Sequence, residues 1–358
     1  MTSTSGHGDP GSEGTLRLPE PLSPDPSTAP GLRWGLISPG HIADQFTATA
    51  HRATASRVVS VCSRSQERAE AFAAEHGATG AFDSPRAMLE AGGIDVVYVA
   101  SPHAQHHAYA RAVLEAGVPV VVEKAFTLNR PEAEDLLELA AQHRLFAMEA
   151  MWARFLPQYD VLRQVLSSGL LGTIVEVSAE HGQWFPEDAQ HRLYDPALGG
   201  GALLDLGVYP LSFAQMVVGD LTDPVIQGDL AFTGVDAYVG LLARGARGGR
   251  ARVATTLNAR MPNEAVVTGT EGTARLTGPF YAPGTLAVSL RDGRSARFEH
   301  PGAPGDGMAY EIAEAARRIS AGEQQSPWMS WEDTLSVMGT MDAARAALGV
   351  TYPGEVAS

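Results

Sequence analysis

A run of five apolar residues at 118–122, four of them valine, places the strongest limit on how this chain can fold. Such an unbroken run is typical of a strand that is buried on both faces of a parallel sheet. The run ends at Glu123 and Lys124, and ligands of open α/β sheets bind at the carboxyl ends of strands. Because buried charges are costly unless they are paired or used, the two residues form a candidate active-site pair. The alternative is an ordinary salt bridge at a solvated strand end.

The residues around this run alternate between strand and helix patterns. Strands are predicted at 32–37, 57–62, 94–100 and 145–150, and helices at about 42–50, 66–76, 84–91, 104–116 and 130–143. This alternation is the signature of a parallel sheet with helices on its faces. Residues 151–157 then lead out of the predicted α/β domain.

The first strand runs into a turn that partly matches a dinucleotide-binding fingerprint. The G-x-G-x-x-G/A pattern puts glycines where the backbone turns tightly and approaches a pyrophosphate. Gly40 fills the middle position and Ala43 the third, whereas Ser38 stands where the first glycine belongs. Unpaired N–H groups at the start of the following helix, at His41 and Ile42, favour phosphate binding. An ordinary strand–helix turn is the alternative.

The end of the second strand bears on the choice of cofactor. Proteins that bind NAD commonly have a carboxylate there, which accepts a hydrogen bond from the ribose 2′-hydroxyl. This chain has Ser63, Arg64 and Ser65 instead. A guanidinium and short hydroxyl side chains suit a 2′-phosphate, so we expect NADP(H) to be preferred, with NAD(H) possible. The alternative is an unremarkable surface arginine.

Polar residues also follow the third strand, at Ser101, His103 and His106. We expect these side chains to make polar contacts with the cofactor. Histidine is a common zinc ligand, but no cysteine or acidic cluster accompanies these two histidines in the sequence. Solvated residues at the N-terminus of a helix are the remaining alternative.

The second half of the chain has a different pattern. After a helix predicted at about 158–168, residues 173–180 alternate between apolar and polar, as a half-exposed strand does. Similar stretches occur at 237–243, 251–258, 265–269, 273–276, 286–290 and 296–299. Short turns rich in Gly, Asp and Asn join them, which predicts a mostly antiparallel sheet.

One long helical pattern, at about 194–211, interrupts these strands. Three glycines at 199–201 would leave backbone N–H groups open to a close-lying ligand. Asp205 and Tyr209 are four residues apart and therefore share one face of a helix. A buried carboxylate needs a partner, and Lys124 is the nearest unexplained cation. The alternative is a carboxylate near a helix N-terminus beside a core tyrosine.

Composition excludes several classes of protein. The net charge is −15 and the pI is about 5.1, so we expect no nucleic-acid partner. Cys62 is the only cysteine, which excludes an intrachain disulfide, and its apolar neighbours indicate a buried, inert thiol.

We find no pattern of a membrane span or a secretory signal and expect a cytoplasmic protein. Residues 1–30, rich in Ser, Thr, Gly and Pro, are expected to form a disordered tail.

Together these motifs resemble the glucose–fructose oxidoreductase/inositol dehydrogenase (Gfo/Idh/MocA) family, and most closely its dimeric dihydrodiol dehydrogenase-like branch. The resemblance covers roughly residues 31–345. The ordered matches are residues 34–37 with Gly40, Ile42 and Ala43; Ser101, Pro102, His103 and His106; Glu123 and Lys124; Glu149, Met151, Trp152, Arg154 and Phe155; and 199–201 with Asp205, Gly207 and Tyr209. Ala125 replaces the family's proline after the lysine, so we expect an ordinary trans peptide bond between Lys124 and Ala125.

The resemblance implies a fold and an activity. The fold class is an α/β Rossmann N-terminal domain at 31–152, followed at 153–358 by an α+β domain with a large open, mostly antiparallel sheet. The activity is NAD(P)-dependent hydride transfer between nicotinamide and a hydroxyl or carbonyl group of a sugar or small cyclic polyol. The broad, half-apolar face of the open sheet also predicts a homodimer or a higher homo-oligomer.

The resemblance further implies roles for individual residues. Lys124 would stabilise the developing alkoxide, and Asp205 would keep Lys124 charged and aimed. Tyr209 would donate or accept the proton, with its pKa lowered by the nearby ammonium. Glu123 would position the cofactor, and no metal would be needed. The expected walls of the substrate pocket are Trp152, Arg154 and Trp184.

Two other functions are compatible with the sequence. A ligand-binding or regulatory protein would keep the Rossmann fold without catalysis, and the departures at Ser38 and Ala125 favour this interpretation. A hydrolase would use bound nicotinamide as a redox relay to cleave a glycosidic bond. Turnover of NADP(H) with a panel of sugars distinguishes the first alternative, and bond cleavage without net cofactor change distinguishes the second.

Overall fold

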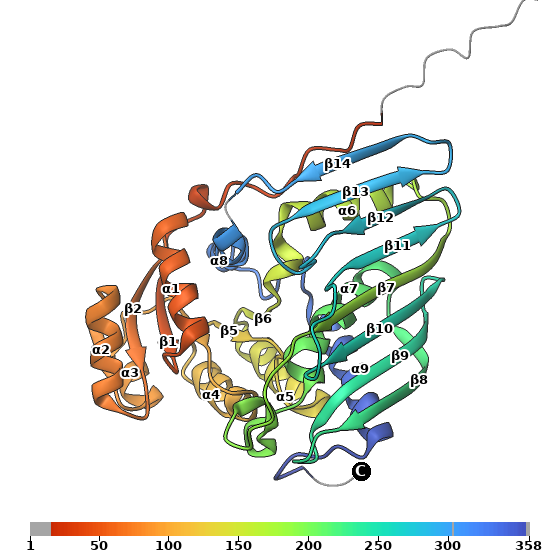
Figure 1. Ribbon diagram of the computed structural model, residues 1–358. Coiled ribbons are helices and arrows are strands. Elements are labelled where there is room, and N and C mark those ends of the chain that lie inside the picture. The colour runs from red at the N-terminus through yellow and green to blue at the C-terminus, as the bar shows by residue number, and fades with distance from the viewer. Residues whose placement is uncertain (1–15, 303, 356–358) are drawn as a thin grey trace, which may run out of the picture.

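The computed structural model describes residues 16–302 and 304–355 and contains two β-sheets (Figure 1). The first sheet has six parallel strands in the order β3-β2-β1-β4-β5-β6. These strands are β1 (Arg33–Ile37), β2 (Arg57–Cys62), β3 (Gly80–Phe82), β4 (Val96–Val99), β5 (Val120–Glu123) and β6 (Ala147–Ala150). The expected Rossmann sheet is confirmed. Strand β3 was not predicted, because three half-buried residues are too few to give a recognisable strand pattern.

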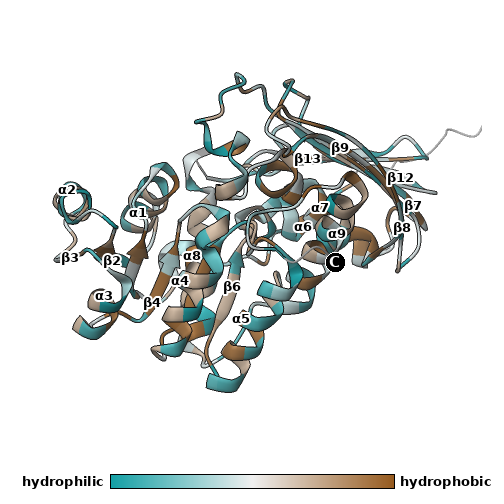
Figure 2. Cartoon of the chain, turned by 90° about the horizontal axis from the view of Figure 1, so that it is seen from below, coloured by the Kyte–Doolittle hydropathy of each residue, from teal (hydrophilic) through white to brown (hydrophobic). Residues whose placement is uncertain are grey.

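The valine run forms a buried interior strand of this sheet. Val120, Val121 and Val122 are at most 1% exposed, and β5 lies between β4 and β6. Helices lie on both sides of the sheet, as Figure 2 shows, and so exclude water from both faces. They are α1 (His41–Ala53), α2 (Gln66–His76), α3 (Pro85–Ala91), α4 (His103–Glu115) and α5 (Arg130–His143).

The second sheet has eight strands in the order β14-β13-β12-β11-β7-β10-β9-β8. They are β7 (Ile174–Gly182), β8 (Leu221–Leu230), β9 (Asp236–Gly245), β10 (Arg250–Thr256), β11 (Ala265–Gly269), β12 (Gly272–Leu276), β13 (Thr285–Leu290) and β14 (Ser295–Glu299). All neighbours are antiparallel except β7 and β10, which confirms the mostly antiparallel sheet. The sequence patterns did not predict β8, an edge strand interrupted by Pro224 and Gly228.

The expected long helix at 194–211 is divided into several short elements. The helices of the second half are α6 (Pro157–Ser167), α7 (Val208–Val218), α8 (Gly307–Ser320) and α9 (Trp331–Leu348). Shorter turns are η1 (Pro26–Thr28), η2 (Trp152–Phe155), η3 (Arg192–Tyr194), η4 (Pro196–Leu198), η5 (Leu203–Gly207, a π-helical turn) and η6 (Pro304–Asp306). The stretch Pro196–Val218 is apolar and long enough to cross a membrane, but all of its most apolar part is buried inside the protein.

The last two helices return to the first sheet. Helix α8 packs against α1, and α9 packs against both α5 and α7. At the edge of the first sheet, Ala147 N donates to Gln324 O (3.0 Å), and Trp331 Nε1 donates to Ala147 O (2.9 Å). The predicted boundary at 152/153 therefore separates the two sheets but not the helices that surround them.

The predicted disorder of residues 1–30 is wrong for residues 16–30, which we call the N-terminal strap; residues 1–15 lie outside the described residues. The strap runs past β14 to α1 (Figure 1). The backbone N–H groups of Leu22 and Ser23 both donate to the buried carboxylate of Asp160. Leu16 joins the main hydrophobic core and Ala29 a small buried cluster, so apolar contacts and backbone hydrogen bonds to a buried charge together hold the strap.

Candidate active site

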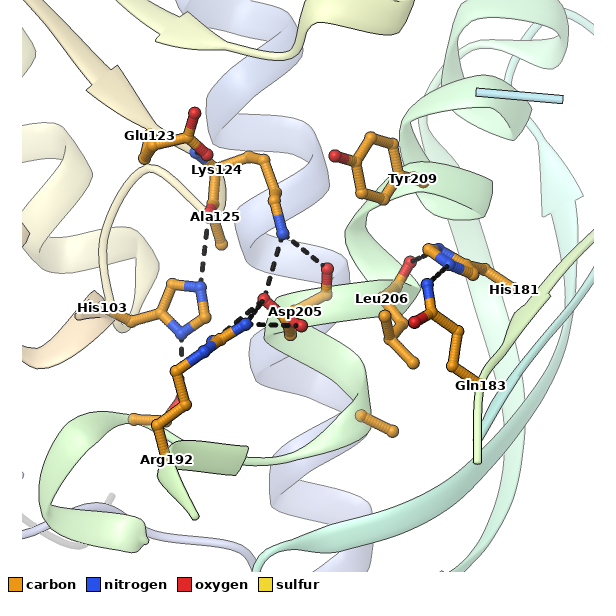
Figure 3. Close-up of polar contacts among 12 residues, drawn as sticks. His103, Glu123, Lys124, Ala125, His181, Gln183, Arg192, Asp205, Leu206 and Tyr209 are labelled. Carbon is orange, nitrogen blue, oxygen red and sulfur yellow. Dashed lines mark hydrogen bonds and ion pairs between the residues drawn. The ribbon is translucent and has the colours of Figure 1, made fainter. Parts of the chain in front are cut away.

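Lys124 follows the last residue of β5 and meets Asp205 from the second half of the chain (Figure 3). Its Nζ lies 2.8 Å from the backbone oxygen of Asp205 and 3.1 Å from Oδ1. The two side chains are only 12% and 9% exposed. The predicted ion pair is therefore present, and it joins the two halves of the chain. Lys124 is also the only lysine in the sequence.

Asp205 has a second cationic partner that the sequence patterns did not predict. Arg192, in the short turn η3, donates to both carboxylate oxygens of Asp205 at 3.2 Å. Burial by itself would raise the pKa of Asp205, but Lys124 and then Arg192 hold that pKa well below its ordinary value. Asp205 is therefore a carboxylate at neutral pH. Arg192 lies before the three glycines at 199–201, in a segment of irregular structure. No helix or strand periodicity in the sequence therefore indicated its contact with Asp205.

Tyr209, in the first turn of α7, lies beside this ion pair (Figure 3). The Nζ of Lys124 is 5.2 Å from the centre of the Tyr209 ring. Trp152 Nε1 donates to the Tyr209 hydroxyl oxygen at 2.9 Å, which leaves the hydroxyl hydrogen free to point elsewhere. The expected lowering of the Tyr209 pKa is wrong. Burial, with Glu123 as the next cause, raises this pKa well above its ordinary value.

Two further aromatic residues pack against Tyr209. The Tyr281 ring lies 4.8 Å from that of Tyr209 and 4.2 Å from that of His181, between centroids. His181 donates from Nδ1 to Leu206 O (3.2 Å), and Gln183 Nε2 donates to its Nε2 (3.0 Å). Burial lowers the pKa of His181 to about 4, so the ring is neutral at physiological pH. These residues come from loops and strand ends far apart in the sequence, where no local pattern indicated them.

The peptide bond between Lys124 and Ala125 is cis, which corrects the expected trans bond. Side chains hold the backbone on both sides of it. His103 Nε2 lies 3.3 Å from Lys124 O, His106 Nδ1 lies 2.9 Å from Ala125 O, and Phe126 N donates to Glu149 Oε1 (3.1 Å). The absence of proline at position 125 therefore did not predict the geometry of this peptide bond. Hydrogen bonds from surrounding residues, and not a proline ring, hold the turn.

The two histidines are not free to contact a cofactor as expected. Both ring nitrogens of His106 lie at backbone oxygens, of Ala125 and of Ser101 (2.7 Å), and its side chain is fully buried. His103 is nearly buried, and its Nδ1 donates to Gly199 O at 2.9 Å. Their contacts are with the turn that carries Lys124. The histidines therefore support this turn rather than line a binding pocket.

The three glycines at 199–201 serve close packing rather than an open backbone. A Cβ at Gly199 would lie 2.6 Å from Leu128, and one at Gly201 would lie 2.3 Å from Asp236 Oδ1. Gly199 and Gly201 also have φ angles of 74° and 120°, in the range that favours glycine. The expectation that these residues leave room for a ligand is therefore corrected. Gly199 lets the segment that carries Asp205 approach the first domain, and Gly201 lets it approach Asp236 of β9 in the second sheet.

A cavity of about 310 Å³ lies at the carboxyl ends of β1 and β2. Its polar lining residues are two arginines and one carboxylate together with hydroxyl side chains: Ser38, Ser63, Arg64, Ser65, Arg68, Asp83 and Tyr109. Ser38 has a φ of 75°, so a serine takes the left-handed conformation that the missing glycine would favour. A Cβ at Gly40 would meet no atom within 4 Å, which leaves space for a pyrophosphate. The lining therefore fits a dinucleotide, and Arg68, in the first turn of α2, is a cationic lining residue that no sequence pattern indicated.

Other predicted cofactor residues lie around this end of the sheet. Ser101 has a buried hydroxyl oxygen without a partner among the described residues, which a bound cofactor can satisfy. Glu123 is buried and accepts from the Tyr98 hydroxyl and from Lys124 N (3.2 Å). His41 is exposed at the start of α1, where its Nε2 lies 3.0 Å from Gln45 Nε2, and Ile42 packs against the core. The predicted buried thiol at Cys62 is confirmed, and burial raises its pKa to about 12.

The three expected wall residues differ in position. Trp152 contacts Tyr209, as described above. Arg154 is 3% exposed, and its guanidinium is occupied by Ser212 and Gln215 of α7, so it packs inside the protein. Trp184 is 65% exposed and lines a separate cavity together with Tyr281. The structure therefore brings Lys124, Asp205, Tyr209 and Trp152 together, and removes Arg154 from the expected pocket.

Comparisons with known proteins identify the family to which this chain belongs. Residues 32–150 match the family model described as the oxidoreductase family with an NAD-binding Rossmann fold, and residues 159–275 match the GFO/IDH/MocA C-terminal domain. Trans-1,2-dihydrobenzene-1,2-diol dehydrogenase of Bos taurus is 33% identical over 334 residues, which cover 90% of this chain and 98% of that protein. The human enzyme of the same name is 32% identical over 335 residues, with the same coverage.

Solved structures extend the comparison to three dimensions. A 3-ketoreductase from Actinomadura kijaniata, in complex with NADP and TDP-benzene, has a TM-score of 0.77 and 27% identity, covering 88% of this chain and 97% of that one. An aldose–aldose oxidoreductase from Caulobacter crescentus has a TM-score of 0.80 at 19% identity, covering 89% and 98%, which shows the shared fold. The chain is therefore an oxidoreductase that belongs to the Gfo/Idh/MocA family, with an NAD-binding Rossmann domain.

Proposed function

We propose that this protein catalyses hydride transfer between NADP(H) and a hydroxyl or carbonyl group of a sugar or small cyclic diol. The observation that carries the proposal is the position of Lys124. Its ammonium is held by Asp205 beside Tyr209, at the carboxyl end of an interior strand of the Rossmann sheet. The names of the similar diol dehydrogenases and of the ketoreductase support a substrate of this class.

The residues of the site divide the chemistry between them. Bound nicotinamide supplies or receives the hydride. Lys124 stabilises negative charge on the reacting oxygen, and Asp205 and Arg192 fix the position of its ammonium. Tyr209 donates the proton in the direction of reduction, because its hydroxyl hydrogen is not used by Trp152. A screen that follows nicotinamide absorbance with sugars, polyols and dicarbonyls at two pH values tests this proposal, and no oxidation or reduction of the cofactor with any of them would contradict it.

The departures that favoured an inactive binding protein have a structural explanation. Ser38 takes the conformation that the absent glycine would supply, and the bond before Ala125 is cis without a proline. Ser38 therefore leaves the turn after β1 in the conformation that the first glycine of the fingerprint would give it. No observation favours the binding-protein alternative over the enzyme.

The preference for NADP(H) rests on two arginines in the 310 Å³ cavity, Arg64 and Arg68. We expect Arg64→Ala to weaken NADP(H) binding about 10- to 100-fold, the value of a charged hydrogen bond to the 2′-phosphate. Binding of NAD(H) should be almost unchanged, and Arg68→Ala should act in the same direction. Titration of both cofactors measures this. Arg130→Ala, which removes an exposed arginine of α5, is the control, and equal losses for NADP(H) and NAD(H) would contradict the assignment.

We also propose that two copies pair through the outer face of the second sheet. This face carries exposed apolar residues on the edge strand β8 and its neighbour β9, with Val225 and Leu242 64% and 45% exposed. Cover by a second copy would remove these side chains from water. Light scattering should give twice the chain mass of 37.8 kDa. A monomeric mass over the working concentration range would contradict the dimer.

A further inference from the structure

A cavity of about 590 Å³ opens at one end of the second sheet. Three loops form it: the one after β7, the one between β10 and β11, and the one between β12 and β13. Its lining includes Gln183, Trp184, Arg260, Asn263, Pro279 and Tyr281. None of the roles proposed above uses this space.

The cavity adjoins the catalytic residues through one side chain. Tyr281 lines the cavity and packs against Tyr209, with 4.8 Å between ring centroids. Lys124, which belongs to the first domain, has its Nζ 5.2 Å from the centre of the Tyr209 ring. Figure 3 shows Gln183, another lining residue, next to His181 on the Tyr209 side of the site. A substrate that contacts Lys124 with its reacting group and also fills the cavity must therefore carry an extension beyond its reacting ring.

The chemistry of the lining is specific. Arg260 is the only charged residue among those that line the cavity, and it forms no ion pair within the described part of the chain. Trp184 is 65% exposed beside it, so the cavity offers a flat aromatic surface next to an unpaired guanidinium. Gln183 and Asn263 add side-chain amides. Guanidinium groups bind phosphate and carboxylate oxygens in a bidentate way, and indole rings stack on apolar ring faces.

The loops around the cavity are fixed to one another by hydrogen bonds. Gly182 N donates to Asn263 Oδ1 (2.9 Å), and Met261 N donates to Gly182 O (3.2 Å). Phe280 N donates to Asn263 O (2.9 Å), which ties the third loop to the second. The cavity is therefore formed before a ligand arrives, and binding does not have to order its walls.

We propose that this cavity binds an anionic group, a phosphate or a carboxylate, at the far end of a substrate whose reacting hydroxyl or carbonyl group contacts Lys124 and Tyr209. Arg260 is then the residue that determines specificity for the charged end, and Trp184 covers the apolar part of the extension. The inference rests on the proposed function and names its substrate class: sugars or cyclic diols that carry an acidic extension.

The test measures binding, so that it does not depend on turnover. D-Glucose, glucose 1-phosphate and glucuronic acid are titrated into the full chain saturated with NADP⁺, and tryptophan fluorescence is followed. At least one anionic sugar should bind about 10- to 100-fold more tightly than glucose, as expected for a charged hydrogen bond. Arg260→Gln should remove this difference, and Trp184→Phe should remove most of the fluorescence response. The phosphate and carboxylate arms show which group the cavity prefers.

Arg297→Gln, which removes an exposed arginine of β14, is the matched control and should keep the preference. If glucose and both anionic sugars bind equally to the wild type, or if Arg260→Gln binds them as the wild type does, the inference is overturned. Failure of the proposed function has a different signature. The anionic sugars would then bind with the expected dependence on Arg260, but no variant or wild-type protein would oxidise or reduce the cofactor.

Discussion

Replacing Lys124 with alanine should lower kcat by about three decades while cofactor affinity stays within about tenfold. The ammonium stabilises charge that develops on the reacting oxygen, and removal of such a group typically costs 10²- to 10³-fold or more. The loss should lie at the upper end of this range because Asp205 and Arg192 would remain paired with each other, with no ammonium at the reacting oxygen. Steady-state kinetics and a separate cofactor titration measure the two quantities.

The sequence offers an independent probe of the same residue. Because Lys124 is the only lysine, reductive methylation can modify only this side chain and the chain's N-terminal amine. Methylation should inactivate the wild type, and NADP⁺ with substrate should slow the inactivation. Lys124→Arg, which keeps a positive charge but not the compact ammonium, should recover little activity. Wild-type kcat in Lys124→Ala would remove this residue from the chemistry.

Tyr209→Phe should lower the rate by roughly 10²- to 10⁴-fold, the usual effect of losing a positioned acid or base. Burial raises the pKa of Tyr209 well above its ordinary value, so the phenol is protonated at neutral pH. Reduction should therefore be nearly independent of pH around neutrality and should fall at alkaline pH. Oxidation, which needs the phenolate, should rise with pH. Rates measured in both directions across the pH range test these signs.

A buried tyrosine outside the site gives the control for this variant. Tyr159 of α6 packs against Phe213 of α7, with 5.8 Å between ring centroids, and Tyr159→Phe should keep the wild-type rate and pH profile. Trp152→Phe would remove the hydrogen bond to the Tyr209 oxygen and should have a smaller effect than Tyr209→Phe. If Tyr209→Phe keeps the wild-type kcat across the pH range, the tyrosine is structural and the proton comes from another group.

Much of the first domain and the central ion pair could be predicted from the sequence. The valine run and the strand–helix alternation are local patterns, and they lead directly to the parallel sheet. Asp205 and Lys124 could be paired because each is a charge in an apolar surrounding that needs a partner. Both inferences use information that lies within a few residues of each group.

The remaining features depend on contacts between distant segments. Arg192 and Tyr281 reach the site from irregular loops, and no periodicity marks them. His106 was expected at the cofactor, but the turn at Ala125 occupies its ring nitrogen. The N-terminal strap was expected to be disordered, because composition measures apolar content and not hydrogen bonds to Asp160. In each case a partner far along the chain decides the outcome.

The most direct test of hydride transfer uses NADPH that carries deuterium at the transferable position, with a panel of sugar and diol carbonyl compounds. We expect a product of the wild-type enzyme to gain one deuterium while NADP⁺ accumulates, and Lys124→Ala to form the same product about three decades more slowly. Cleavage of a glycosidic bond without net change of cofactor would show the hydrolase instead. Cofactor binding without deuterium transfer to any compound would contradict the proposed hydride transfer.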